Sequence, residues 1–289
     1  MSTAVGRNAA GVRAFKKLEI GAIFQIDTAF EIPTTPMKHR LMPSARFFFV
    51  TAPLPCPYLP GRFERRLVTE LSGRQTEGFH DALSGVGFRR SHGIAYVPVC
   101  RDCNACAAVR VRARAFTPNR SQRRVWARDE DLVVEELPAR ATQEQYALFR
   151  AYQQVRHRGG EMARMDFCDY QTLVEDTPVD TLINEVRLPT GRLVGACLAD
   201  RMADGFSAVY SFFETACERR SLGTFMILWL IERARALGLP YVYLGFWVAE
   251  CDKMAYKSRF RPLEAYTPDG WRLLDPDDPE STRQFRSRP

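Results

Sequence analysis

A short turn in the second half of the chain has the features of a phosphate-binding site. Arg220 is followed three residues later by Gly223, and apolar residues recur at helical spacing from residue 222 onward. We therefore predict a helix that begins after Ser221, a favourable N-cap residue. Free backbone N–H groups, a flexible glycine and a cation at the positive end of a helix suit an anion. Because Arg-x-x-Gly is short and common, an ordinary capped helix is the alternative.

A cysteine cluster could hold a metal ion. The chain contains a C-x-x-C-x-x-C run formed by Cys100, Cys103 and Cys106. Thiolates at this spacing can surround one tetrahedral ion. The four-cysteine ferredoxin run is not present, since position 110 is arginine. A fourth ligand would come from elsewhere, with Cys56 as the first candidate and His92 as the second. Packed apolar thiols or a redox-active pair are the alternatives.

A dense group of arginines suits an RNA backbone, because the planar guanidinium group pairs with two phosphate oxygens. Residues 109–114 alternate apolar or small with basic, which predicts a strand with one basic face. The group consists of Arg110, Arg112, Arg114, Arg120, Arg123 and Arg124. Phe116 and Trp126 lie nearby and could stack on bases. A solvated surface is the alternative, because acidic residues follow at 129–135.

Two further segments carry groups that could transfer protons or bind an anion. His157 follows a predicted helix and precedes Gly159-Gly160, which is typical of a loop at a functional site. After a predicted buried strand at 241–247 comes a cluster of Lys253, Tyr256, Lys257 and Arg259. Cations and a hydroxyl so close together suit a carboxylate or a phosphate. A surface helix with exposed lysines is the alternative.

The composition places these residues in a folded protein that has an anionic partner. The chain has 289 residues, 46% of them hydrophobic, and a net charge of +7. No apolar run approaches the length of a membrane span, and the N-terminus lacks the pattern of a signal peptide. We therefore expect a cytoplasmic protein with no membrane partner. In that compartment the eight cysteines argue against a disulfide framework.

The order of predicted elements indicates an α/β (α+β) protein with four regions. Residues 1–36 form an extension, with Met37 as an alternative start, and residues 37–137 form a smaller domain rich in cysteine and arginine. Within that smaller domain, residues 88–99 are expected to form a strand pair around Gly93. Residues 138–274 form a second domain, with a helix at 142–155, a helix that begins after Ser221 and is stopped by Gly238 and Pro240, and strands at 181–186, 193–199, 206–213 and 241–247. Residues 275–289 form a polar tail that we expect to be loose.

Six strings of residues, in order along the chain, resemble the aminoacyl-tRNA–protein transferases. They are residues 56–62, 96–106, 116–124, 220–224, 241–245 and 251–257. The resemblance covers roughly residues 40–275 and is greatest to the bacterial aspartate/glutamate leucyltransferase branch, which is related to eukaryotic arginyltransferase. One departure is Glu214-Thr215 after the strand at 206–213, where the family often has Asp-Pro.

The resemblance implies transfer of an aminoacyl group from charged tRNA to the N-terminal amine of proteins that begin with Asp or Glu. In bacteria the transferred residue is leucine, and the product is marked for N-degron proteolysis. It also implies an acetyltransferase-like (GNAT-type) second domain. Eukaryotic relatives place cysteines around a metal or iron–sulfur cluster, which favours Cys56, Cys103 and Cys106 as ligands of zinc or such a cluster. The transfer step itself requires no cofactor, because the donor is an activated ester.

Under this resemblance each group of residues has an expected role. Lys253, Lys257 and Arg259 are the candidates for binding the acidic acceptor, and the turn from Arg220 to Gly223 for a phosphate near the tRNA 3′ end. The arginines at 110–124 are the candidates for the tRNA backbone. For the proton acceptor the sequence leaves three candidates open, which are His157, Glu214 and Tyr256. Two other functions remain as alternatives: an acyl-CoA-dependent N-acetyltransferase, and a non-catalytic zinc-containing RNA-binding adaptor.

Overall fold

The computed structural model describes residues 46–73, 76–216 and 220–287. Residues 45–289 group into one compact unit. The predicted extension at residues 1–36 lies outside the described residues. None of the helices in the described ranges has the length and apolar character needed to cross a bilayer.

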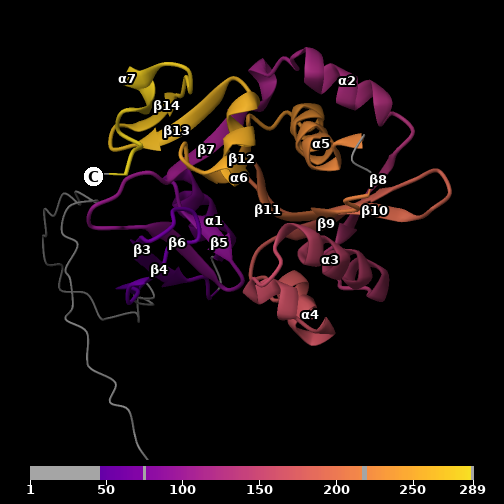
Figure 1. The fold of residues 1–289 in the computed structure, drawn as a ribbon, viewed down its shortest axis with the longest axis horizontal. Coiled ribbons are helices and arrows are strands. Elements are labelled where there is room, and N and C mark those ends of the chain that lie inside the picture. The colour runs from indigo at the N-terminus through magenta and orange to yellow at the C-terminus, as the bar shows by residue number, and fades with distance from the viewer. Residues whose placement is uncertain (1–45, 74–75, 217–219, 288–289) are drawn as a thin grey trace, which may run out of the picture. The chain divides into compact units, whose positions relative to one another are not determined.

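A large mixed sheet organises this unit and confirms the predicted α/β class (Figure 1). Its strand order is β14 (Gly270–Leu273), β13 (Leu263–Thr267), β7 (Ala107–Arg112), β12 (Tyr241–Trp247), β11 (Gly205–Phe213), β10 (Leu193–Met202), β9 (Thr181–Arg187) and β8 (Val133–Pro138). Neighbouring strands are antiparallel except β11 and β12, which are parallel. The boundary predicted near residue 138 falls at the end of β8, and β7 and β8 share this sheet with the strands that follow them in sequence.

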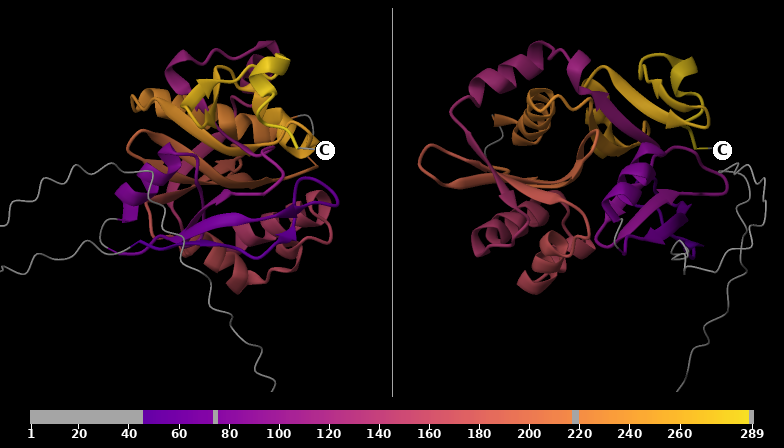
Figure 2. Two further views of the ribbon diagram at one scale, coloured as in Figure 1. Left: turned by 90° about the vertical axis from the view of Figure 1, so that its left-hand side faces the viewer. Right: turned by 180° about the vertical axis from the view of Figure 1, so that it is seen from behind.

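Helices cover both faces of the large sheet. On one face, α5 (Leu222–Ala236) packs against the sheet and contacts α2 (Arg120–Arg128), with Ile231 and Leu230 in the main apolar core. On the other face, α3 (Gln143–Arg156) and α4 (Phe167–Glu175) form a second core around Phe149 and Tyr170. Figure 2 shows the two pairs of helices on opposite sides of the sheet.

A smaller sheet lies beside β12. It has the strand order β1 (Phe48–Val50), β4 (Arg66–Glu70), β6 (Ile94–Pro98) and β5 (Arg89–Ser91), with α1 (Thr76–Gly85) packed against it. The β5–β6 hairpin confirms the strand pair predicted around Gly93. A two-stranded ribbon, β2 (Leu54–Pro55) and β3 (Phe63–Glu64), follows β1.

Short elements connect and close the sheets. They are η1 (Ala113–Ala115), η2 (Glu161–Arg164), α6 (Asp252–Ala255), η4 (Tyr256–Arg259) and α7 (Pro279–Thr282). The segment expected to be a loose tail is packed in its described part, because Phe285 is buried and residue 287 forms an isolated bridge with Cys103. This segment therefore covers one end of the cysteine-containing region.

The start of α5 is where the sequence predicts it, although the reason differs. Ser221 is the N-cap residue, but its φ is +51° and its side chain makes no capping hydrogen bond. By contrast, α2 and α3 have complete capping boxes, formed by Asn119 with Gln122 and by Thr142 with Gln145. Among the described residues, no side chain caps the first turn of α5, which suits a helix end that receives an anion.

Candidate active site

An opening in the large sheet provides the central feature of the site. The strands β11 and β12 pair only over residues 205–207 and 241–243, at one end of the two strands. Beyond that point β11 continues beside β10 as far as residue 213, while β12 continues beside β7 as far as residue 247. The helix α5 connects the two strands. This β11–α5–β12 crossover agrees with the predicted α/β class. Where the two strands separate, the backbone carbonyls of Ala208, Val209 and Leu244 accept hydrogen bonds from Arg89.

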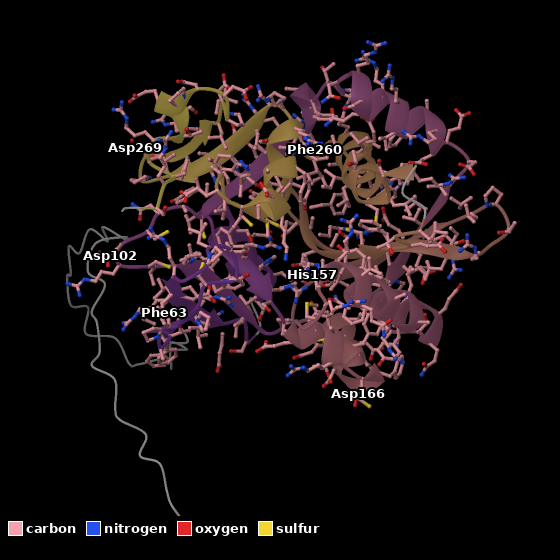
Figure 3. All side chains as sticks on the ribbon, in the orientation of Figure 1. Phe63, Asp102, His157, Asp166, Phe260 and Asp269 are labelled. Atoms are coloured by element: carbon pink, nitrogen blue, oxygen red, sulfur yellow. The ribbon has the colours of Figure 1, made fainter. Side chains whose placement is uncertain are left out.

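His157 lies at the end of α3, where it is partly buried. Its ring centroid is 5.7 Å from that of Tyr152, whose ring lies 5.0 Å from that of Phe213 in β11. Burial lowers the pKa of His157, and the positive charges of Lys253 and Arg156 lower it further. The imidazole is therefore neutral at pH 7 and can accept a proton. Figure 3 labels His157 near the middle of the molecule.

Tyr256 is the second candidate that reaches this region. The phenol is 40% exposed, but burial of its hydroxyl raises the pKa, as does the nearby Tyr152 hydroxyl. The positive charge of Arg89 opposes this rise. A hydroxyl that stays protonated near a fixed cation can donate a hydrogen bond to a developing oxyanion. Tyr152 is therefore in contact with His157 and in electrostatic range of Tyr256.

Glu214, the third candidate, is held in an ion pair. It follows β11, and both of its carboxylate oxygens accept hydrogen bonds of 2.8 Å from Arg192. Glu214 is therefore engaged by Arg192, whereas the His157 ring lies beside Tyr152.

The three cations predicted to bind the acceptor do not form one pocket. Lys257 is buried, and its ammonium group donates to the Phe246 carbonyl at 2.5 Å. Burial lowers its pKa well below the usual value, with a further contribution from the charge of Arg89. The expectation that Lys257 meets the acceptor carboxylate is therefore corrected: the buried amine already has a backbone partner.

The other two cations are exposed. Lys253 acts on His157 through its charge. The backbone carbonyl of Arg259 accepts a 3.0 Å hydrogen bond from Gln122, which places Arg259 beside α2. Of the three predicted cations, Lys253 alone is exposed and also lowers the pKa of His157 through its positive charge.

The predicted phosphate turn carries a paired arginine. The Arg220 guanidinium donates to Asp131 at 2.6 Å and to Asp129 at 3.4 Å. Burial raises the pKa of Asp129 to about 6, and Arg220 opposes this rise. A Cβ at Gly223 would lie 3.0 Å from the Phe213 ring, so α5 and β11 approach closely at this glycine. A phosphate at this turn would compete with Asp131 for Arg220.

The arginine group divides into buried and exposed members. Arg110 is buried, with its guanidinium 2.8 Å from Glu264 and 3.5 Å from the centre of the Tyr241 ring. The expectation that it contacts tRNA is corrected, since the side chain has buried partners on the face of the sheet. The exposed members are Arg112, Arg114, Arg120, Arg123 and Arg124. The last three lie on α2, where Trp126 packs against Phe225.

The predicted metal ligands gather at one cavity of about 400 Å³. Its lining includes all four predicted cysteines, Cys56, Cys100, Cys103 and Cys106. His92, the second choice for a fourth ligand, lies in the β5–β6 turn and is not among the lining residues. The donor chemistry suits zinc or an iron–sulfur cluster. However, no three His, Cys, Asp or Glu side chains in the described residues are arranged to hold an ion. A metal at these four cysteines stays a prediction.

Sequence reasoning missed two residues of this site. Tyr152 lies between His157 and Phe213, and Arg89 reaches the opening between β11 and β12. Arg89 belongs to a segment far away in sequence, so no local pattern links it to the opening. The helical spacing of Tyr152 with Phe149 was the one signal available for the tyrosine.

Comparison with known proteins identifies relatives over most of the chain. Residues 54–124 match the family described as arginine-tRNA-protein transferase, N terminus, and residues 144–267 match its C terminus. An aspartate/glutamate leucyltransferase of Paramagnetospirillum magneticum is 54% identical over 242 residues, which cover 84% of this chain and 99% of the relative. Another, of Rhodospirillum rubrum, is 54% identical over 230 residues, covering 79% and 94%.

A solved structure is also similar. The structure of L-PGS from Bacillus licheniformis aligns with a TM-score of 0.44 and 12% sequence identity, covering 64% of this chain and 66% of that one.

Proposed function

The chain belongs to the aminoacyl-tRNA–protein transferase family, and we propose that it transfers leucine from charged tRNA to the α-amine of proteins that begin with Asp or Glu. The observation that carries this proposal is the 54% identity to an aspartate/glutamate leucyltransferase over 99% of that relative. His157, which is linked to β11 through Tyr152 and Phe213, together with Tyr256 and Lys253 supplies groups suited to the reaction. The product carries a new N-terminal leucine that marks it for proteolysis.

The reaction needs alignment, charge stabilisation and proton transfer. The acceptor α-amine attacks the ester carbonyl carbon of the aminoacyl group, a C–N bond forms, and the bond to the ribose oxygen of the tRNA breaks. The amine loses a proton and the departing ribose oxygen gains one. His157, neutral at pH 7, takes the amine proton, and Tyr256 donates a hydrogen bond to the oxyanion. The ester is already activated, so this step uses no cofactor.

Acceptor selection is assigned to Lys253. Its ammonium group is exposed and acts on His157 through its charge, so an acidic side chain beside it would lie near the base. Substrate binding excludes water from such a contact, and a charge-assisted hydrogen bond is then worth about 1.5–3 kcal/mol. A first residue of lysine would meet a like charge at the same place.

The tRNA is assigned to the exposed face of α2 and the start of α5. Arg120, Arg123 and Arg124 project from α2, which contacts α5. The first turn of α5, without a side-chain cap, is suited to a phosphate near the 3′ end. This places the charged backbone of the RNA on the same face of the sheet as the helix that follows β11.

The test is direct transfer from charged tRNA. The protein is incubated with labelled Leu-tRNA or Arg-tRNA and with peptides that start with Asp, Glu, Lys or Ala. We expect labelling from Leu-tRNA of the Asp and Glu peptides alone. Acetyl-CoA replaces the tRNA in a parallel reaction. Acetylation without tRNA would support an acetyltransferase, and equal labelling of Lys and Asp peptides would refute the proposed acceptor selection.

A further inference from the structure

Arg89 reaches from the smaller sheet to the opening in the larger one. It begins β5, and the strand register places it in one cross-strand row with Tyr96, Val68 and Phe49. Directly paired residues share a face of a sheet. The Tyr96 ring centroid lies 5.9 Å from that of Phe246, so this face of the smaller sheet packs on β12. The hairpin β5–β6 therefore delivers Arg89 to the large sheet.

The guanidinium group bridges the two separating strands. Its Nη2 donates to the carbonyls of Ala208 at 3.1 Å and Val209 at 3.2 Å in β11. Its Nη1 donates to the carbonyl of Leu244 at 3.4 Å in β12. These carbonyls come directly after Ser207 and Tyr243, the last residues that pair between the strands. The planar guanidinium group thus bonds to both strands just beyond the point where the backbone hydrogen bonds between them end.

The backbone of β12 is shaped around this side chain. Gly245 has a φ of +74°, and the pairing of β12 with β7 shifts register between residues 243 and 245. A Cβ at Gly245 would lie 1.3 Å from Nη1 and 2.1 Å from Cζ of Arg89. No side chain can stand there while the guanidinium group keeps its place. The observed position of the Arg89 guanidinium group therefore requires glycine at position 245.

We propose that Arg89 is a positioning residue for aminoacyl transfer, which fixes the width of the opening between β11 and β12 and holds a permanent positive charge beside Tyr256 and Lys257. This inference rests on the proposed function, because the ester and the amine are taken to meet in that opening. The charge of Arg89 acts on both neighbours: it favours the neutral amine of Lys257 and opposes the effect of burial on Tyr256. A displaced guanidinium group would let both strands and both neighbours move.

A kinetic comparison of variants tests the inference. Arg89→Met removes the bridge while keeping an unbranched stem, and Gly245→Ala displaces the guanidinium group from the other side. In each we expect kcat to fall ten- to a hundredfold, in the range that follows from a misplacement of about 1 Å, with peptide KM and tRNA affinity within about twofold of wild type. Arg89→Lys should recover little, because one ammonium group lacks the planar fork that spans both strands.

Two controls separate positioning from general stability. Gly191→Ala introduces a Cβ at a φ of +85° with no atom within 4 Å outside its chain neighbours, so it reproduces the backbone strain without a steric clash. It should lose thermal stability but keep the wild-type kcat. The double variant Arg89→Met, Gly245→Ala should be no slower than the slower single variant, because both substitutions disrupt the same bridge. Additive losses would overturn the inference.

Other outcomes are equally decisive. A wild-type kcat in Arg89→Met would overturn the inference while leaving the proposed function standing. If Arg89→Met does not fold, Gly245→Ala and Arg89→Lys provide the test. In both variants kcat should fall while the peptide KM stays near the wild-type value, and a wild-type kcat would overturn the inference. A wild-type protein that transfers no aminoacyl group would overturn the proposed function, and this inference with it.

Discussion

The ammonium group of Lys257 donates a hydrogen bond to the backbone carbonyl of Phe246, 2.5 Å away, inside the protein. This hydrogen bond ties η4 to the part of β12 that has left the parallel pair with β11. A lysine so placed holds the end of the strand instead of meeting a substrate. Lys253, one helical turn earlier in the chain, is exposed and remains available to an acceptor.

Replacement of the two lysines by methionine should have different consequences. Lys253→Met should lower kcat/KM for Asp and Glu peptides by about tenfold, which corresponds to the lower end of the free-energy range of a charge-assisted hydrogen bond. The tRNA affinity should be unchanged. Lys257→Met should leave the selectivity among peptides unchanged and alter thermal stability, because the Phe246 carbonyl loses its partner. Peptide kinetics and tRNA binding of both variants provide the measurement. Lost selectivity in Lys257→Met with none in Lys253→Met would reverse the assignment.

The rate should depend on pH through His157. Its pKa is lowered, so the imidazole stays neutral at pH 7 and the acid limb of kcat should lie below the ordinary value of about 6.5. Lys253→Gln removes a positive charge and should raise the pKa, which moves this limb to higher pH. NMR titration of the His157 ring measures the same shift directly. Arg158→Gln, an exposed neighbour, is the control. An unmoved His157 titration in Lys253→Gln would contradict the pairing of these two groups.

The salt dependence of tRNA binding should identify the arginines of α2. Replacing Arg123 and Arg124 by alanine should weaken binding and reduce the slope of log K against log salt by about one for each phosphate that is no longer neutralised. Arg283→Ala is the control, because that exposed arginine pairs with Glu280 on α7. Filter binding at several salt concentrations gives the slope. A slope equal to that of the control would reject the α2 surface.

Cys106 in the cysteine cavity should react more slowly with alkylating reagents than an exposed cysteine elsewhere in the chain. Burial raises the pKa of Cys106 to about 12, and the neighbouring thiolates raise it too. At pH 8 its alkylation by iodoacetamide should therefore be far slower than that of the exposed Cys168, since the thiolate is the reactive form. Mass spectrometry after timed labelling compares the two sites. Equal rates would show that Cys106 is not buried as a thiol. The same labelling after incubation with zinc, under anaerobic conditions, shows whether an ion protects the four cavity cysteines together.

The sequence by itself determined the family, the class of fold and the elements that local pattern controls. The strand pair around Gly93 and the helix after Ser221 follow from turn residues and from apolar spacing, which depend on neighbours within a few positions. The ordered strings of residues identified the transferase family because they extend over both halves of the chain. His157 was found as a candidate because an imidazole before two glycines is visible in a single segment.

The tertiary structure alone decided which charged groups are available to a substrate. Lys253 and Lys257, like Arg110 and Arg112, read alike in sequence, yet one member of each pair is buried against a partner from another element of the fold. Arg89 meets Gly245 only because the β5–β6 hairpin packs on β12. Burial of a charge depends on what covers it and on which distant groups satisfy its hydrogen bonds. Those partners are brought together by the packing of the two sheets, which the spacing of residues along the chain does not specify.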